Sequence, residues 1–168
     1  MRIINCVLGI LAILMVTASA ASAAGSLDVC GIVNANDATA ILGQPLMMKL
    51  PAITDNAGFG IYMCMYIGPA MSGEGAQTKL SRLTVQVGSG KDVPDLMQVD
   101  ADKRKATIAL SGVGDAAKRN ADGSFVWAKQ GSVYCTADIS NGLRKGLTAD
   151  AAATQLGGLC KKVLAAAR

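Results

Sequence analysis

The sequence predicts an α+β domain: an antiparallel sheet with a short N-terminal helix and a longer C-terminal helix packed on it, stapled by disulfides. Two patterns indicate the elements. Leu83, Val85 and Val87 alternate with polar residues, the period of a half-buried strand. Apolar residues recur at three- and four-residue spacing through 148–166, the period of an amphipathic helix. Helices at both ends with strands between them favour an antiparallel sheet.

The first residues have the pattern of a secretory signal. Arg2 precedes an uncharged apolar run at 7–16, and small residues follow it. This order predicts a signal peptide over 1–23, with cleavage between 20 and 25, and a single domain over 24–168. We therefore expect a secreted protein, periplasmic or extracellular, with no stable membrane span after signal removal.

Two other interpretations of this segment are weaker. A retained transmembrane anchor needs about 20 apolar residues, and this run is shorter. A lipid anchor on Cys30 would need small residues just before it, where the chain has Leu27, Asp28 and Val29. A soluble product is the better interpretation.

Three segments carry helix start and stop signals. Asn34 can cap the first, Asp37 lies in its first turn and Gly43 can close it in the left-handed region. Asp92 and Pro94 can begin the second, and Thr148 can cap the third. The expected helices are 34–42, 93–105 and 148–166.

Strands are expected where β-branched and aromatic residues lie between turn signals. In the first of them Met63 and Met65 share parity with Ile61 and Ile67, which predicts that these four face the core, and Gly68-Pro69 is expected to end the strand. Whether the extended stretch 46–50 is core or an exposed apolar strip stays open. The expected strands are 61–67, 79–87, 106–110, 124–128 and 132–139, the last two as a hairpin.

Four cysteines remain once Cys6 leaves with the signal, which predicts two disulfides in an oxidising compartment. Cys135 lies on the apolar face of its strand and Cys160 on the apolar stripe of the last helix, so these two are expected to pair, as are Cys30 and Cys64. Each bond would be worth about 3–4 kcal/mol. Four cysteines allow three pairings. A zinc site is disfavoured because its ligands normally come in close pairs.

The chain lacks the residues that most catalytic and cofactor sites require. The chain has no histidine, which removes Ser-His and Cys-His pairs and the usual metal-water sites. The only glutamate, Glu74, lies in a glycine-rich stretch unsuited to holding a proton donor. We expect no enzyme activity and no cofactor; an Asp/Lys-based hydrolase is kept as a second alternative.

Several short motifs have plainer interpretations. The sequence 112–117 (GVGDAA) matches a dinucleotide pattern, but a turn at 120–123 leaves no room for the helix that such a site needs, so a tight bend between strands is expected. Fragments of calcium loops at Asp100 and Asp102, and at Asn120 and Asp122, are expected to be turns.

The formal charge of +4 is spread along the chain, which argues against nucleic acid. Basic pairs that can meet anionic lipid or a cell-wall polymer are more typical of solvated surface. These pairs are Lys118-Arg119, Arg144-Lys145 and Lys161-Lys162.

A cysteine before a capped helix ending in 42–45 (LGQP), Cys64 in an MCMY strand, and GVGDAA before a hairpin and a terminal helix resemble a family of small exported bacterial domains of unknown function. Its best-known members are actinobacterial lipoproteins. The resemblance implies a cell-envelope α+β domain, a disulfide between the first two cysteines and no established catalytic residues. The chain departs from it in having no lipid-attachment cysteine after the signal, and in the pair Cys135 and Cys160.

These observations favour an exported, non-catalytic binding or accessory domain that recognises an unidentified envelope ligand or protein through loops or an exposed sheet face. The alternative is a thiol- or copper-handling protein that uses Met63, Cys64 and Met65, since thioethers favour Cu(I). That alternative requires Cys64 to be free.

Overall fold

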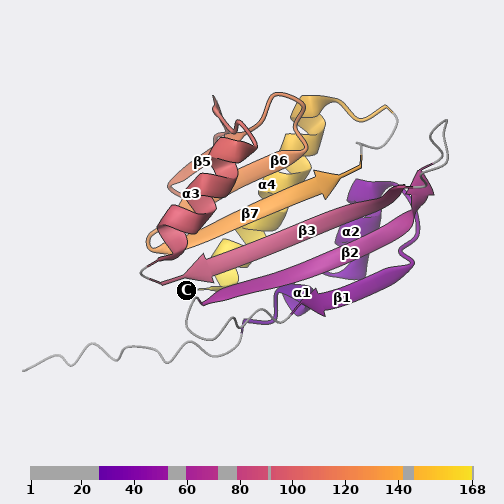
Figure 1. Cartoon of the computed structure of the whole chain (residues 1–168), viewed down its shortest axis with the longest axis horizontal. Coiled ribbons are helices and arrows are strands. Elements are labelled where there is room, and N and C mark those ends of the chain that lie inside the picture. The colour runs from indigo at the N-terminus through magenta and orange to yellow at the C-terminus, as the bar shows by residue number, and fades with distance from the viewer. Residues whose placement is uncertain (1–26, 53–59, 72–78, 91, 142–145, 168) are drawn as a thin grey trace, which may run out of the picture.

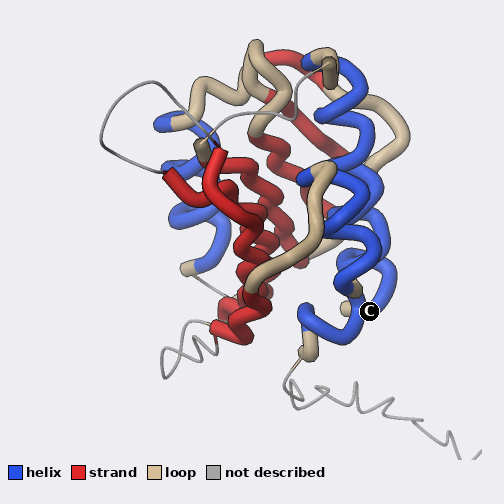
Figure 2. The backbone as a smooth tube through the Cα atoms, turned by 90° about the vertical axis from the view of Figure 1, so that its right-hand side faces the viewer, coloured by secondary structure: helices blue, strands red, loops and turns tan. Residues whose placement is uncertain are grey.

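The computed structural model describes residues 27–52, 60–71, 79–90, 92–141 and 146–167. The expected signal peptide, Glu74 and the basic pair Arg144-Lys145 lie outside these residues. A single twisted sheet has helices on both faces, as the edge-on view shows (Figure 2). Within the described part of the chain, no helix combines the length and apolar character needed to cross a bilayer.

The sheet has seven strands in the order β1-β2-β3-β7-β6-β5-β4, and every neighbouring pair is antiparallel (Figure 1). The predicted fold class is confirmed. The helices are α1 (Val29–Ile32), α2 (Ala35–Leu42), α3 (Val93–Lys103) and α4 (Ala149–Ala166). The strands are β1 (Met48–Ala52), β2 (Ile61–Met71), β3 (Lys79–Ser89), β4 (Ile108–Ala109), β5 (Ala116–Arg119), β6 (Phe125–Gln130) and β7 (Val133–Ser140).

One face of the sheet is covered by α1, α2 and α4, and the larger core lies beneath them. The caps predicted for these helices are confirmed. The Asn34 side chain and Asp37 form a capping box on α2, Gly43 closes it at a φ of 69°, and the Thr148 hydroxyl accepts from the Ala151 amide at the start of α4.

Of the described helices, α3 alone lies on the opposite face. Val93, Met97 and Ala101 of this helix pack on Phe125 and Trp127 in a second, smaller core. Gly88 lets the helix approach β3, because a Cβ at this position would come within 2.6 Å of Val93 Cγ1. With this contact at its start and the second core along its length, α3 lies over β3, β7 and β6.

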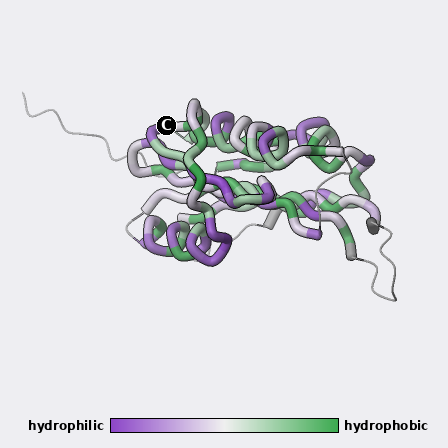
Figure 3. Tube along the Cα trace, turned by 90° about the horizontal axis from the view of Figure 1, so that it is seen from above, coloured by the Kyte–Doolittle hydropathy of each residue, from purple (hydrophilic) through white to green (hydrophobic). Residues whose placement is uncertain are grey.

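A single helix cannot cover this face. Seven strands spaced by about 4.8 Å give a sheet about 29 Å wide, whereas a helix with its side chains is about 10–12 Å across. Seen from above, α3 lies on the opposite side of the sheet from the other described helices (Figure 3), and in the front view it lies over the β7, β6 and β5 part and not over β1 and β2 (Figure 1). Among the described residues, no helix therefore covers the β1 and β2 side of this face, and we call it the open face.

The structure corrects the predicted facing of β2. Cys64 and Tyr66 are fully buried under the helices, whereas Met63 and Met65 point to the open face and are half-buried. Apolar residues occupy both parities of this strand because both of its faces are partly covered, so parity alone could not assign the core side.

Three element boundaries also differ from expectation. β2 continues through Gly68-Pro69 to Met71, with a register shift between Ile67 and Ala70, where proline has no N–H to donate to the ladder. β4 has only two residues. α3 ends at Lys103, and at its start the Asp92 side chain makes no capping hydrogen bond. The stretch 46–50, left open by the sequence, is mostly exposed edge strand.

Candidate functional site

A pocket of about 240 Å³ opens on the boundary between the open face and the end of α3. Its floor comes from three neighbouring strands and its wall from the last turn of the helix. We call it the sheet-face pocket. It is lined by Met63 and Met65 of β2, Arg82, Thr84 and Gln86 of β3, Thr136 and Asp138 of β7, Asp100 of α3, and Arg104, the residue that follows α3.

The strand register explains why these side chains meet. Met65 pairs with Thr84, and Thr84 pairs with Asp138, so the three form one row across the sheet. Met63, Gln86 and Thr136 form the next row. Because side chains paired directly across antiparallel strands lie on the same face, both rows point into the pocket. The pocket thus has an apolar side from β2 and a polar side from β3 and β7.

A chain of polar contacts runs along the floor. Arg104 and Asp138 form an ion pair, with 3.1 Å between Nη1 and Oδ1, and Arg104 Nη2 donates to Oδ2 at 3.2 Å. Ser140 Oγ also donates to Oδ2, at 2.7 Å. Oδ1 is buried and accepts no hydrogen bond, because its contact with Arg104 is one of charge without bonding geometry. The ion pair ties the end of α3 to the middle of the sheet.

Arg82 is the cation in the pocket that has no carboxylate partner among the described residues. Its Nη2 donates to Ser140 Oγ at 3.1 Å. Its Nε is buried and has no acceptor among the described residues. A buried donor left unpaired costs about 1–3 kcal/mol, and more when it carries charge. The guanidinium of Arg82 is therefore under-satisfied within this part of the fold.

Asp100 contributes a titratable carboxyl group to the wall of the pocket. Burial raises the pKa of its carboxyl, the neighbouring Arg104 lowers it, and the charge on Asp138 raises it further. The net direction is upward from the ordinary value, so the pocket disfavours the charge on Asp100.

Apolar side chains continue from the pocket to the edge of the sheet. Leu50 pairs with Met65, and Met48 pairs with Ile67, so all four lie on the open face. Met48 is 51% exposed and Leu50 is 40% exposed. Methionine is flexible and polarisable, so a surface of this kind adapts to differently shaped apolar groups.

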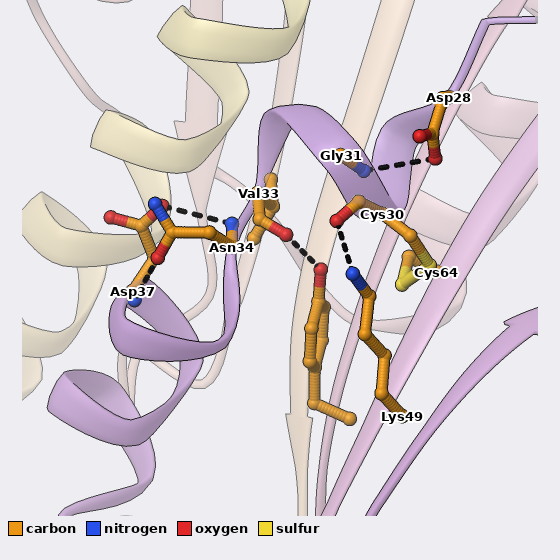
Figure 4. The surroundings of a disulfide bond; sticks show 9 residues. Asp28, Cys30, Gly31, Val33, Asn34, Asp37, Lys49 and Cys64 are labelled. Carbon is orange, nitrogen blue, oxygen red and sulfur yellow. Dashed lines mark hydrogen bonds between the residues drawn. A yellow bond between two sulfur atoms is a disulfide. The ribbon is translucent and has the colours of Figure 1, made fainter.

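The disulfide predicted between Cys30 and Cys64 is present, with 5.2 Å between the Cα atoms (Figure 4). It joins α1 to β2 on the helix-covered face. Lys49 Nζ donates to the Cys30 carbonyl at 2.6 Å, and the Tyr66 hydroxyl donates to the Val33 carbonyl. These contacts fix the N-terminal helices on the sheet.

This bond overturns the copper hypothesis in its stated form. Cys64 is bonded to Cys30 and lies on the opposite face of β2 from Met63 and Met65, so the three do not share a site. Among the described residues, no three side chains of His, Cys, Asp or Glu gather as a metal site.

The second predicted disulfide is not formed in this structure. Cys135 and Cys160 are both free and fully buried. Burial raises the pKa of the Cys135 thiol, and a hydrogen bond with Cys160 raises it further. The two side chains meet between β7 and α4 as expected, but as thiols. The predicted contact is therefore right, and the predicted bond between them is wrong.

The remaining motifs are structural. Gly112 and Gly114 have φ of 78° and 59° and turn the chain before β5, as the tight-bend interpretation predicts. Burial opposes a lower pKa at Asp122, but hydrogen bonds from the Ser124 amide and hydroxyl lower it and hold the turn there. Asp100 and Asp102 lie in α3, which corrects the expected turn.

Three side chains of the basic pairs have partners within the fold. Lys118 lies over the Trp127 ring at 5.7 Å. Arg119 pairs with Asp150 at 2.5 Å, and Lys162 pairs with Asp37 at 2.6 Å. These charges bind structural partners, and their pairing does not favour an anionic-surface site.

Sequence reasoning missed the sheet-face pocket. Its residues come from four elements spread over 63–138, and no local spacing connects them. One signal was available: polar residues Arg82, Thr84 and Gln86 alternate with the core residues of β3, which marks a second, partly solvated face.

No family model matches the chain, and neither the curated proteins nor the solved structures contain a match to it. The fold and the pocket therefore define its class: a disulfide-bonded α+β domain with a small amphipathic pocket on an open sheet face. The resemblance to exported bacterial envelope domains stays an expectation.

Proposed function

We propose that this chain is an exported, non-catalytic binding domain of the cell envelope, and that the sheet-face pocket is its ligand site. The observation that carries the proposal is the pocket itself, because methionines line one side of it and an under-satisfied arginine lies on the other. Small-molecule sites commonly combine an apolar lining with a few placed polar groups. A ligand with an anionic group would neutralise the arginine, and its apolar part would cover the methionines.

Export is supported by the N-terminal pattern and by the Cys30–Cys64 bond, since disulfides persist in oxidising compartments. The binding role without catalysis is supported by the state of the pocket carboxylates. Asp138 is held by Arg104 and Ser140, and such pairing suits a structural anion better than a mobile proton carrier.

The test is an amide NMR titration of the mature protein with three short compounds that share one chain: hexanoate, 1-hexanol and hexylamine. The pocket is slightly smaller than the range of about 300–1,000 Å³ typical of drug-sized ligands, so small probes are appropriate. At least one compound is expected to shift amides of β2, β3 and β7 with a dissociation constant of about 1 mM.

A matched pair of variants locates the site. Met65→Gln makes the apolar side of the pocket polar without adding charge and is expected to weaken these shifts strongly. Met47→Gln makes the same change at a side chain that is 66% exposed outside the pocket, and is expected to leave them unchanged. Shifts that are absent for all three compounds, or unaffected by Met65→Gln, would reject the proposed site.

One observation favours a second candidate function, an Asp-based hydrolase. Asp100 and Asp138 share the pocket, and the pKa of Asp100 is raised mainly by burial. A raised carboxyl pKa beside an ionised carboxylate is the arrangement of general acid catalysis. Turnover of simple esters, peptides or glycans that is lost in Asp100→Asn and retained in Asp95→Asn, an exposed position on the same helix, would establish this function in place of the first.

A further inference from the structure

Deepening the proposed function, on which this inference rests, we propose that the ligand of the sheet-face pocket is a short aliphatic carboxylate and that Arg82 binds its carboxylate group. The proposal starts from charge. Arg104 is neutralised by Asp138, with 3.1 Å between Nη1 and Oδ1, whereas Arg82 has no carboxylate within 4.0 Å among the described residues. The cation that is left over is the one that lines the pocket beside the apolar strand.

The hydrogen bonds of Arg82 point to the same group. A guanidinium presents five N–H donors in a planar fork that matches a carboxylate. Among the described residues only Nη2 has an acceptor, Ser140 Oγ at 3.1 Å, and the buried Nε has none. An anion that reaches Nη1 from the pocket neutralises the charge and strengthens the whole guanidinium network.

The neighbours of Arg82 select the rest of the ligand. Arg82 pairs in register with Ile67, and the adjacent row holds Met65 and Leu50, so an apolar surface begins directly beside the guanidinium. A carboxylate on Arg82 would place its alkyl chain over these side chains. Burial of each methylene is worth about 0.8 kcal/mol, so the chain contributes affinity and the head group contributes orientation.

The pocket also holds two carboxylates, which could bind an ammonium ligand instead. Their contacts disfavour this alternative. Asp138 already binds Arg104 and Ser140. Asp100 lies beside the same Arg104, which offsets its charge. Both carboxylates therefore have a cation next to them, whereas Arg82 has no carboxylate partner among the described residues.

The experiment compares head groups on one chain by calorimetric titration at pH 7. Hexanoate is expected to bind the wild-type protein at least about 5-fold tighter than 1-hexanol and hexylamine. Equal affinity for all three would overturn the carboxylate inference while leaving the proposed binding site intact. Tighter binding of hexylamine would show that Asp100 and Asp138 dominate, and would also overturn it. If no compound binds, the proposed function itself fails.

Arg82→Gln tests the residue. It is expected to lower the affinity for hexanoate about 10-fold and to change the affinity for 1-hexanol less than about 2-fold, because only the carboxylate binds the guanidinium. Lys161→Gln removes the same charge from an exposed position on α4, on the far side of the sheet, and is expected to change neither. Hexanoate affinity that survives Arg82→Gln rejects the assignment. The head-group comparison needs no variant, so it decides the case if Arg82→Gln does not fold.

The terminal carboxylate of a peptide presents the same chemical group. We commit to the free acid because the pocket holds about 240 Å³ and is small for a peptide end. The test compares the affinities of two peptides, acetyl-Ala-Ala-Leu with a free C-terminal acid and the same peptide with a C-terminal amide, with that of hexanoate. If the acid peptide binds no tighter than hexanoate, the free acid stands. If it binds more than about 10-fold tighter and the amide does not, the source is a peptide and the commitment is wrong.

Discussion

Arg104 at the end of α3 reaches Asp138 in the centre of the sheet, and this ion pair forms one wall of the sheet-face pocket. The Asp138 side chain is only 11% exposed, whereas that of Arg104 is 42% exposed. The pair therefore lies between a surface salt bridge and a buried one, and its loss leaves a largely buried carboxylate without its cation.

Arg104→Gln is expected to lower the free energy of unfolding by about 1–2 kcal/mol, because Asp138 stays buried with one partner fewer. Urea denaturation of the two proteins measures the difference. Lys103→Gln removes a charge from the neighbouring exposed position of α3 and is expected to change the stability by less than about 0.5 kcal/mol. Equal effects of the two substitutions would show that the ion pair does not secure α3.

The state of the cysteines is a separate prediction. When the mature protein is unfolded without reductant and treated with iodoacetamide, two thiols are expected to react, those of Cys135 and Cys160. In the folded protein both are buried and should react slowly, since the thiolate is the reactive form and burial raises the pKa of Cys135. Intact mass counts the added groups. A mature protein that gains none before reduction would contain a second disulfide.

The Cys30–Cys64 bond is expected to contribute about 3–4 kcal/mol, because it closes a loop with a sequence separation of 34 residues in the unfolded chain. Thermal unfolding of the Cys30→Ser/Cys64→Ser double variant measures this contribution. Cys135→Ser, which touches no disulfide, serves as the comparison for loss of a buried thiol. A double variant as stable as the wild-type protein would contradict the expected role of the bond.

The raised pKa of the Tyr66 hydroxyl leads us to expect that the folded protein loses stability in alkaline solution. Burial raises the pKa of this hydroxyl well above the ordinary value of 10.0, and the charges of Asp37 and Asp28 raise it further. Above pH 10 the unfolded chain loses this proton while the folded chain keeps it, so the unfolded state binds fewer protons and the free energy of unfolding falls as pH rises. Below pH 10 the contribution is fully present.

Tyr66→Phe isolates this effect. It is expected to cost about 1–2 kcal/mol at pH 7, because the buried Val33 carbonyl loses its donor, and to show a smaller decline in stability above pH 10 than the wild-type protein. Denaturation between pH 8 and about 11 compares the two slopes. Parallel slopes would mean that Tyr66 ionises equally in both states.

The two glycines of the GVGDAA bend form a matched pair. Both have positive φ, but a Cβ at Gly112 meets nothing within 4 Å, whereas a Cβ at Gly114 would overlap the Lys129 carbonyl. Gly112→Ala is expected to cost about 1–2 kcal/mol from the left-handed backbone alone, and Gly114→Ala at least about 1 kcal/mol more. Chemical denaturation checks the order, and equal losses would contradict this account of the bend.

Local signals predicted much of this fold. The caps at Asn34, Gly43 and Thr148, the hairpin of β6 and β7 and the alternation in β3 were all read from neighbouring residues, and the structure confirms them. Such features depend on contacts within a few positions of the chain.

The facing of β2 and the position of the pocket depend on contacts between distant elements. Cys64 faces the helices because Cys30 lies there, and Met65 faces the pocket because α3 covers only the other half of the sheet. Neither relationship leaves a local pattern. The Cys135–Cys160 pair shows the same limit, since the pattern predicted the neighbours but not whether a bond forms.

Methionine methyl NMR with hexanoate tests the central claim most directly, because one spectrum contains both the site and its controls. Met63 and Met65 line the pocket, Met97 lies in the second core and Met47 is exposed outside the pocket. We predict that hexanoate shifts the methyl signals of Met63 and Met65 in a saturable way and leaves those of Met47 and Met97 in place. No shift at Met63 and Met65, or equal shifts at all four, would contradict a ligand site on the open face of this sheet.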